Sequence, residues 1–294
     1  MSHRGRVWTA LWAVYIMWGS TYLFIAIADD TIAPLTAVST RFFAAGLLLA
    51  AIVVRRGGSM RVTRRELASC ALVGALLPGA NALLFFAERD VPIGIASLLI
   101  ASVPLFVVVV RVWSRDRIRK RPLVGVAVGF VGVAILVRPS GSATATGIAL
   151  CLISAVMWAV GSVAGARLTM PENSVAATAW EMLAGGVLLL PFGIANAGHF
   201  APSLSSVLAW LYLVTIGSVV GYTAYTWLLA NAPLSMVSTY AYVNPVVAIL
   251  LGVLFRGEHL TGQILIGAVI VIAGVAVVVR QEPPAAAAPE EGVR

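Results

Sequence analysis

The sequence predicts an all-α membrane protein with ten transmembrane helices, arranged as two inverted repeats of five helices each. Hydrophobic residues make up 60% of the 294 residues and charged residues 11%, whereas soluble domains are about 45–50% apolar and about 25% charged. The apolar residues form ten runs, each close to the length of about 20 residues that crosses a bilayer. Motifs of the first half recur in the second half. These observations place the chain in lipid and divide it into two similar units.

The ten predicted spans, in chain order, are 8–27, 35–54, 67–87, 92–113, 122–138, 147–167, 174–195, 205–229, 234–255 and 261–279. The first could also be the core of a cleaved signal peptide, because Arg4 and Arg6 precede it and Ala26-Ile27-Ala28 resembles a cleavage site. It is, however, longer than the roughly 7–15 residues of a signal-peptide core, and its Met-Trp motif recurs in the second half. We therefore interpret it as a retained helix.

The basic residues predict the orientation in the membrane. A net charge of +8 could indicate nucleic-acid binding, but the basic residues cluster between the apolar runs, so no nucleic-acid partner is expected. If the N-terminus is cytoplasmic, 16 of the 20 Lys and Arg lie in the cytoplasm, Arg89, Arg138 and Arg256 lie outside, and Arg41 lies within a span. The positive-inside rule then predicts an inner (plasma) membrane protein with both termini cytoplasmic. The Pro- and Ala-rich segment 281–294 is expected to be a disordered cytoplasmic tail.

The internal repeat has a period of about 141 residues. The recurring motifs are Pro92 and Pro104 with Pro233 and Pro245, Gly132-Val133-Ala134 with Gly274-Val275-Ala276, and Met17-Trp18 with Met157-Trp158. We divide the chain into a first repeat at 1–139 and a second at 140–280. Because each repeat has an odd number of spans, the second must be inverted relative to the first. Secondary transporters are often built in this way, with the substrate site near the bilayer midplane.

The motif Trp18-Gly19-Ser20, Arg41 and the run Pro245…Glu258…Gly267…Gly274 resemble the EamA domain of the drug/metabolite transporter superfamily. The resemblance covers roughly residues 8–280. It implies ten helices in two inverted EamA repeats and the export of small metabolites such as amino acids, with YddG-like amino-acid exporters among the candidate relatives. The sequence departs from an ideal repeat at two places. Arg117 aligns with Glu258, with Asp116 one residue away, and Glu181 aligns with Arg41.

Two ionisable residues lie within predicted spans, where charge is costly and a functional role is the default hypothesis. Arg41 is expected to anchor a substrate carboxylate or another anion, although it could instead clamp backbone carbonyls or extend to the membrane surface. Glu181 is expected to couple protons or bind a substrate amine, although it could be a protonated structural residue. Each lies about 10 Å deep at about 1.5 Å per residue, but from opposite membrane surfaces. The sequence therefore does not require Arg41 and Glu181 to pair.

Aromatic and amide residues within the spans complete the predicted substrate-binding group, which consists of Trp18, Ser20, Arg41, Asn81, Trp158, Glu181, Tyr222, Tyr225, Tyr240 and Asn244. A cavity for a small amphipathic solute combines an apolar wall with a few hydrogen-bonding groups. The alternative is that these residues pack helices or anchor them at the interface. Pro104 and Pro245 interrupt helical hydrogen bonding within spans and are candidate hinges.

The sequence has no HExxH, GxSxG or glycine-rich phosphate loop, and Lys120 is its only lysine. No enzyme activity, cofactor or metal site is therefore expected, and Cys70 and Cys151 are read as small core residues. The leading hypothesis is a secondary transporter of small metabolites, an exporter of amino acids or related solutes that works by alternating access. A membrane-embedded enzyme and a non-transporting membrane sensor are the alternatives. The expected partners are a small-molecule substrate and the lipid bilayer, and the sequence leaves the oligomeric state open.

Overall fold

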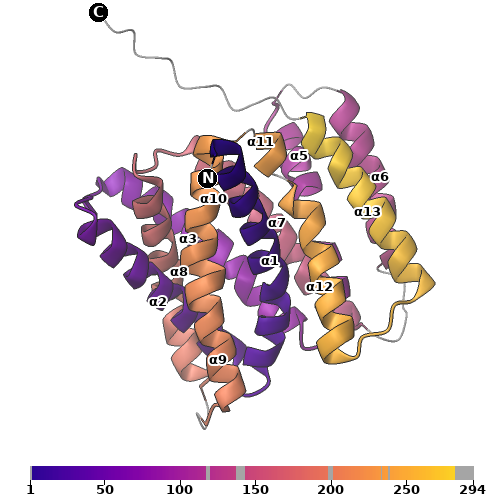
Figure 1. Ribbon diagram of the computed structural model, residues 1–294, viewed down its shortest axis with the longest axis horizontal. Coiled ribbons are helices and arrows are strands. Elements are labelled where there is room, and N and C mark those ends of the chain that lie inside the picture. Colours follow the sequence, from indigo (N-terminus) through magenta and orange to yellow (C-terminus); the bar gives the residue numbers. More distant parts are fainter. Residues whose placement is uncertain are drawn as a thin grey trace, which may run out of the picture.

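The computed structural model describes residues 2–116, 120–136, 143–197, 201–232, 234–237 and 239–281. These residues form α1 (His3–Asp29), α2 (Pro34–Arg55), α3 (Arg64–Ala87), α4 (Ile93–Ile100), α5 (Val103–Trp113), α6 (Lys120–Leu136), α7 (Ala145–Arg167), α8 (Ser174–Ala195), α9 (Leu204–Tyr212), η1 (Leu213–Val220), α10 (Gly221–Asn231), α11 (Leu234–Val237), α12 (Tyr240–Arg256) and α13 (Gly262–Gln281) (Figure 1). Apart from Gln281, the predicted tail lies outside the described residues, as do Arg117 and Pro233.

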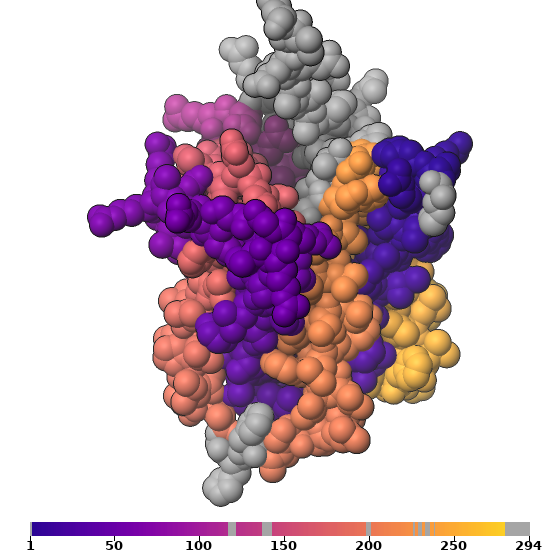
Figure 2. Space-filling view, turned by 60° about the vertical axis from the view of Figure 1, so that its left-hand side comes forward, coloured from indigo at the N-terminus to yellow at the C-terminus, as the bar shows by residue number. Residues whose placement is uncertain are grey.

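The ten predicted spans are confirmed as ten apolar helical segments of one bundle (Figure 1). Among the described residues, eight segments are long and apolar enough to cross a membrane, and Pro122–Leu136 and Tyr240–Arg256 are shorter apolar helices. The flanks of the bundle expose apolar side chains, as a lipid environment requires. Figure 2 shows the face on which α2 lies beside α9 and η1, and the exposed apolar side chains of these three helices include Leu48, Leu208 and Val220.

Three of the ten segments are interrupted. The fourth breaks into α4 and α5 at a turn through Ala101 and Ser102, and Pro104 lies in the first turn of α5. The eighth contains the π-helix η1 between α9 and α10, and the ninth consists of the short α11 followed by α12. Interrupted helices free backbone groups at membrane depth, which is tolerated where they are buried in protein or line a cavity.

Equivalent helices of the two halves cross in opposite directions, as an inverted repeat requires. At the crossing of α2 and α8, a Cβ added to Gly46 would lie 2.7 Å from Cγ of Leu183, and one added to Gly186 would lie 2.5 Å from the nitrogen of Phe43. Position 46 corresponds to 186 and position 43 to 183, so the repeat exchanges these two contacts. The two helices run antiparallel, because the contact nearer the start of α2 is the one nearer the end of α8.

The crossing of α6 and α13 follows the same rule. A Cβ on Gly125 would lie 2.8 Å from the carbonyl oxygen of Gly274, and one on Gly132 would lie 3.1 Å from that of Gly267. Gly125 corresponds to Gly267 and Gly132 to Gly274, so the repeat again exchanges the contacts. Small residues let these helices approach closely. The antiparallel crossings agree with the predicted fold class of two inverted five-helix repeats.

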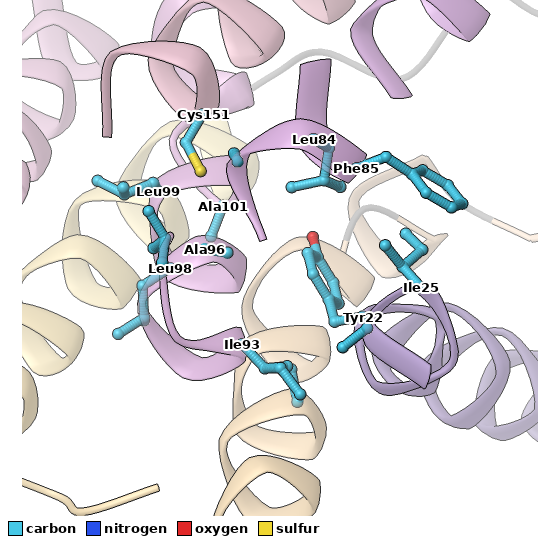
Figure 3. Close-up of a cluster of buried hydrophobic side chains, with 14 of the residues drawn as sticks. Tyr22, Ile25, Leu84, Phe85, Ile93, Ala96, Leu98, Leu99, Ala101 and Cys151 are labelled. Atoms are coloured by element: carbon cyan, nitrogen blue, oxygen red, sulfur yellow. The ribbon is translucent and has the colours of Figure 1, made fainter. Parts of the chain in front are cut away.

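The interior between the crossings is apolar. Figure 3 shows Tyr22 and Ile25 of α1 facing Leu84 and Phe85 of α3, beside the short helix α4 and Cys151 of α7. Cys70 and Cys151 are buried free thiols, which agrees with the reading of both as small core residues.

We refer to the two ends of the bundle by the carboxylates that mark them. At the Glu258 end, α1, α3 and α12 end and α4 begins; at the Asp116 end, α5 and α7 end. Gly257 and Arg115 both have left-handed backbones, with φ of 66° and 62°, and they are 142 residues apart. The structural counterpart of Glu258 is therefore Asp116, and the alignment of Glu258 with Arg117 is corrected by one residue.

Glu258 caps helix α4 from the other half of the molecule. Its carboxylate accepts hydrogen bonds from the backbone N–H groups of Ile93 and Gly94, the latter at 2.9 Å. A carboxylate is favourable there because the N-terminus of a helix has unpaired N–H groups and a partial positive charge. Gly252 leaves room for it, since a Cβ on Gly252 would lie 2.5 Å from Oε2 of Glu258.

Asp116 makes different contacts at the opposite end. It accepts from Nε of Arg111 at 3.0 Å and from Nη2 of Arg167 at 2.8 Å. The hydrogen bond from Arg111 lowers the pKa of Asp116 below its usual range. The two equivalent carboxylates thus hold the two ends of the bundle together in different ways.

Candidate substrate cavity

A cavity of about 120 Å³ lies within the bundle. The chain reaches it from α1, α2 and α3, from the junction of α4 and α5, and from α7, η1, α10 and α12. Nine of the residues singled out in the sequence line it, namely Trp18, Arg41, Asn81, Trp158, Tyr222, Tyr240, Asn244 and the two prolines Pro104 and Pro245. Residues far apart in the sequence and drawn from both halves therefore meet at one place.

Arg41 supplies the only charged side chain among the residues that line this cavity. It is only 4% exposed. Its Nε donates to Oγ of Ser218 at 3.1 Å, and its guanidinium lies 5.0 Å from the ring centroid of Phe42. Its Nη1 is buried and has no hydrogen-bond partner among the described residues. Because an arginine stays charged, an anion in the cavity would supply the missing acceptor.

The π-helix η1 positions this guanidinium. Ser218 holds Nε, and a Cβ on Gly217 would lie 3.5 Å from Nη2, so the glycine leaves space beside the charge. The carbonyl of Gly217 also accepts from Nε1 of Trp18 at 3.2 Å. Short π-helical segments are frequent at functional sites. Ser218 was not predicted as a site residue, because the residue pattern of η1 does not differ from that of an ordinary apolar helix.

Aromatic rings form a second wall of the cavity. The ring of Trp18 lies 5.4 Å from Tyr222, 5.0 Å from Tyr225 and 5.1 Å from Tyr240, measured between centroids. Tyr225 packs against Trp18 and Tyr240 without lining the cavity itself. The faces of Trp and Tyr rings attract cations, so this wall differs in character from the guanidinium of Arg41.

The two prolines leave backbone acceptors at the cavity. A proline has no N–H group, so Pro104 cannot donate to the carbonyl of Ile100 one turn earlier, nor Pro245 to that of Ala241. Ile100 and Ala241 both line the cavity, and they are 141 residues apart. The repeat therefore provides an equivalent acceptor from each half.

Polar side chains complete the lining. Asn81 donates to the carbonyl of Leu77 at 3.2 Å, and Ser154 donates to that of Ala80 at 2.7 Å. In the orientation that satisfies its neighbours, the amide of Asn244 donates to the carbonyls of Tyr240 and Tyr15. The lining residues Thr21, Tyr22, Ser97 and Ser154 were not singled out in the sequence. Thr21 and Ser97 donate to carbonyls of their own helices, those of Trp18 and Gly94, as small hydroxyls commonly do.

Two other predicted site residues lie away from the cavity. Oγ of Ser20 donates to the carbonyl of Met17 at 3.0 Å and lies 2.7 Å from the hydroxyl of Tyr212. Glu181 lies on α8 where this helix crosses α3, and a Cβ on Gly74 would lie 2.3 Å from its carbonyl oxygen. Within the described residues, no hydrogen bond or ion pair joins Arg41 to Glu181. Both charges act on Tyr222, which lines the cavity.

Both halves of the chain match the model of the EamA-like transporter family, at residues 7–138 and 145–280. The uncharacterized inner membrane transporter YedA of Escherichia coli K12 is 40% identical over 258 residues, which cover 86% of this chain and 83% of the relative. A probable amino-acid metabolite efflux pump of Salmonella typhimurium is 27% identical over 89% of this chain and 90% of its own length. A probable terminal-alkyne amino-acid exporter of Streptantibioticus cattleyicolor is 29% identical over 92% and 94%.

A crystal structure with 24% sequence identity has a TM-score of 0.64 and covers 94% of this chain and 96% of its own, which shows that the fold is shared. The expected resemblance is thus confirmed. The chain is a multi-pass inner membrane transporter and not an enzyme, and it belongs to the EamA-like transporter family.

Proposed function

We propose that this chain is a secondary transporter that exports amino acids or closely related small solutes by alternating access. The observation that carries the proposal is the buried guanidinium of Arg41, whose Nη1 lacks a partner in a cavity lined by both halves. A substrate carboxylate accepts hydrogen bonds from the guanidinium, which presents its donors in a planar fork. The names of two relatives, an amino-acid metabolite efflux pump and an amino-acid exporter, support this substrate class.

The remaining lining suits the rest of an amino acid. An ammonium group finds the carbonyls of Ile100 and Ala241 and the ring faces of Trp18 and Tyr240, since no acidic side chain lines the cavity in the described part of the chain. Apolar lining residues such as Leu84 and Val103 accept the side chain. A zwitterion therefore matches the cavity better than a cation without a carboxylate, which would face Arg41 unpaired.

The repeats 1–139 and 140–280 act as the two moving units, with Pro104 and Pro245 as hinges. The Asp116 end is cytoplasmic, because most basic residues of the connecting segments belong to that side, and α1 begins and α13 ends there. Glu181 supplies the proton-coupling carboxylate near the cytoplasmic side of the cavity, where its charge reaches Tyr222. If it couples protons, Glu181→Gln changes the pH dependence of transport while binding of the carboxylate to Arg41 persists.

Counterflow in liposomes tests the proposal. Purified protein is reconstituted with an unlabelled panel of amino acids, their decarboxylated amines and purine bases inside, and labelled solute is added outside. We expect exchange with amino acids and none with the amines, which lack the group that Arg41 binds. Exchange with the amines but not with the amino acids would overturn the assignment. Product formation without exchange would favour the membrane-embedded enzyme, and ligand binding without exchange would favour the sensor.

A further inference from the structure

The carboxyl group of Glu88 is buried, and the proposed transport mechanism gives it no role. It directly follows α3 at the Glu258 end, on the connection to α4. Both of its carboxylate oxygens are buried and have no hydrogen-bond partner among the described residues. The other buried side-chain atoms in this condition are Nη1 of Arg41 and Oδ1 of Asp29. Buried polar groups are nearly always paired, so an unpaired one needs an explanation.

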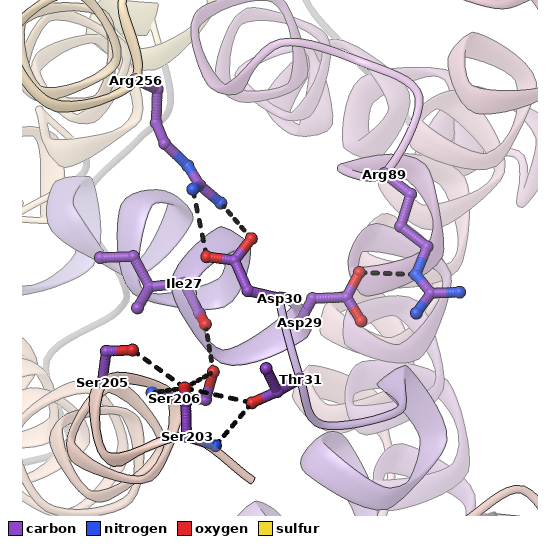
Figure 4. Close-up of polar contacts among 9 residues, drawn as sticks. All are labelled: Ile27, Asp29, Asp30, Thr31, Arg89, Ser203, Ser205, Ser206 and Arg256. Carbon is purple, nitrogen blue, oxygen red and sulfur yellow. Dashed lines mark hydrogen bonds and ion pairs between the residues drawn. The ribbon is translucent and has the colours of Figure 1, made fainter.

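The cations near Glu88 are engaged elsewhere. Arg89 donates Nε to Oδ2 of Asp29 at 2.7 Å, and Arg256 donates Nη1 and Nη2 to the carboxylate of Asp30 at 3.2 and 3.0 Å (Figure 4). Arg41 donates Nε to Oγ of Ser218 at 3.1 Å. Neither Arg256 nor Arg41 forms an ion pair with Glu88 in the described chain, although both attract its charge from a distance.

Other acidic groups face Glu88 as well. The ionisable groups that act on it are Asp29 and Tyr22 of α1, Arg41 of α2, Cys151 of α7, and Arg256 and Glu258 at the end of α12. Asp29 and Glu258 repel a negative charge on Glu88, and the thiol and phenol are ordinarily neutral near pH 7. Burial, followed by these two carboxylates, raises the pKa of Glu88 well above its usual range.

An ionised Glu88 would therefore be a buried charge without a partner, which proteins avoid by neutralising the group. A metal cation is not favoured, because no group of three His, Cys, Asp or Glu among the described residues could hold one. Glu88 also lies next to the transport cavity. Its N–H donates to the carbonyl of Leu84 at 3.0 Å, and Leu84 and Tyr22 line the cavity. Figure 3 shows the hydroxyl of Tyr22 turned toward Leu84.

We propose that Glu88 is a proton-binding site at the Glu258 end, and that closure of this end requires the carboxyl group to be protonated. When the end is closed, the carboxylate takes up one proton and becomes a neutral carboxylic acid. When the end opens, water hydrates Glu88, and the proton returns to the solvent. The role in opening rests on the proposed transport function, but proton binding itself does not and can be measured without any substrate.

Infrared titration of the full chain in lipid nanodiscs tests proton binding. A protonated carboxyl has a C=O stretching band that the carboxylate lacks. We expect this band to persist at pH 7 in the wild type and to lose intensity in Glu88→Gln, which keeps the shape of the neutral acid. Glu66→Gln is the matched control, because Glu66 is a partly exposed acid whose carboxylate is hydrogen-bonded to Thr63 at the start of α3. A band of unchanged intensity in Glu88→Gln would overturn the proposal.

The counter-ion separates a proton from a metal cation. The titration is repeated with sodium in place of choline, and the band should be the same in both salts. Loss of the band in sodium alone would assign the site to a metal cation and overturn the proposal. If the band depends on Glu88 but the protein shows no counterflow, proton binding at Glu88 is supported and the proposed transport of amino acids is rejected.

A distance measurement tests the link to closure. Spin labels at Asp90→Cys and His259→Cys, two exposed positions on either side of the α4 cap, report the width of the Glu258 end. We expect the distance between the labels to increase as the pH rises through the pKa of Glu88, and to stay short at every pH in Glu88→Gln. The same increase in Glu88→Gln would show that another group controls the opening.

Discussion

Glu258 and Asp116 occupy equivalent positions in the two halves, each directly after a residue with a left-handed backbone, yet of the two only Glu258 caps a helix within the described residues. It accepts from the N–H groups of Ile93 and Gly94, while Asp116 accepts from two arginines. The carboxylate of Glu258 therefore joins the end of α12 in the second half to the start of α4 in the first half.

Removal of this cap should destabilise the protein. In Glu258→Ala the two N–H groups lose their acceptor, and we expect a loss of about 1–3 kcal/mol, which thermal unfolding in detergent will measure. Asp116→Ala is the control, because its ion pairs are partly exposed and such pairs contribute about 0–1 kcal/mol. An equal loss in both variants would show that the cap contributes no more than a surface ion pair.

Replacement of Arg41 should weaken recognition of carboxylates. Arg41→Met keeps much of the volume but removes the charged donors, which are worth about 1.5–3 kcal/mol or about ten- to a hundredfold in affinity. The solute concentration that gives half-maximal counterflow measures this loss. Ser218→Ala, which removes only the group that holds Nε, should have a smaller effect. Unchanged affinity in Arg41→Met would remove Arg41 from the site.

Replacement of either cavity proline should slow transport without loss of stability. In Pro245→Ala a new N–H group can bond to the carbonyl of Ala241, which straightens α12 and occupies the acceptor. In Pro104→Ala the first turn of α5 loses the fixed backbone angle that proline provides. The initial rate of counterflow and the melting temperature are measured together. Pro191→Ala is the control, since Pro191 lies inside α8 but is exposed and away from the cavity. Equal slowing in all three variants would exclude a specific hinge role.

The crossing of α6 and α13 should not tolerate a methyl group. A Cβ on Gly274 would lie 2.5 Å from the backbone of Gly129, so Gly274→Ala should destabilise by about 1–3 kcal/mol through overpacking. In contrast, Gly165→Ala meets its nearest neighbour at 3.7 Å and should be neutral or up to about 1 kcal/mol more stable. Thermal unfolding distinguishes the two variants. Similar melting temperatures in the two variants would show that α6 and α13 can move apart to accept the methyl group.

Cysteine labelling should show a single orientation. Single cysteines at Ser59 and Glu172, both exposed at the Asp116 end, should react with an impermeant reagent only from the cytoplasmic side. Cysteines at Thr31 and His259, exposed at the Glu258 end, should react only from outside. The native Cys70 and Cys151 are buried and provide the unlabelled background. Labelling of both ends from the same side would contradict the membrane topology.

The sequence predicts the level of a residue along its helix better than the direction in which its side chain points. Arg41 and Glu181 were selected by the same argument, yet only Arg41 lines the cavity. A hydropathy pattern gives the level of a residue along its helix, but the facing of its side chain depends on how neighbouring helices cross. At the crossing of α6 and α13 the backbones approach so closely that glycines are needed, as at Gly125 and Gly274.

Glu88 and Ser218 show why the remaining site residues were missed. Glu88 follows the end of a predicted span and resembles any charged residue of a connecting loop, because the burial of its oxygens arises only in the folded chain. Ser218 holds Arg41 from the π-helix η1, which the sequence did not predict. Neither effect leaves a periodic pattern in the sequence.

The unequal use of Glu258 and Asp116 bears on how the protein changes shape. Glu258 contacts the first residues of α4. By the correspondence between the two repeats, the equivalent contact would join Asp116 to the first residues of α11. A conformation in which Asp116 caps α11 and Glu258 no longer caps α4 would have the same number of helix caps. The two conformations would then differ little in free energy, so a solute that binds one of them modestly better would shift the equilibrium between them.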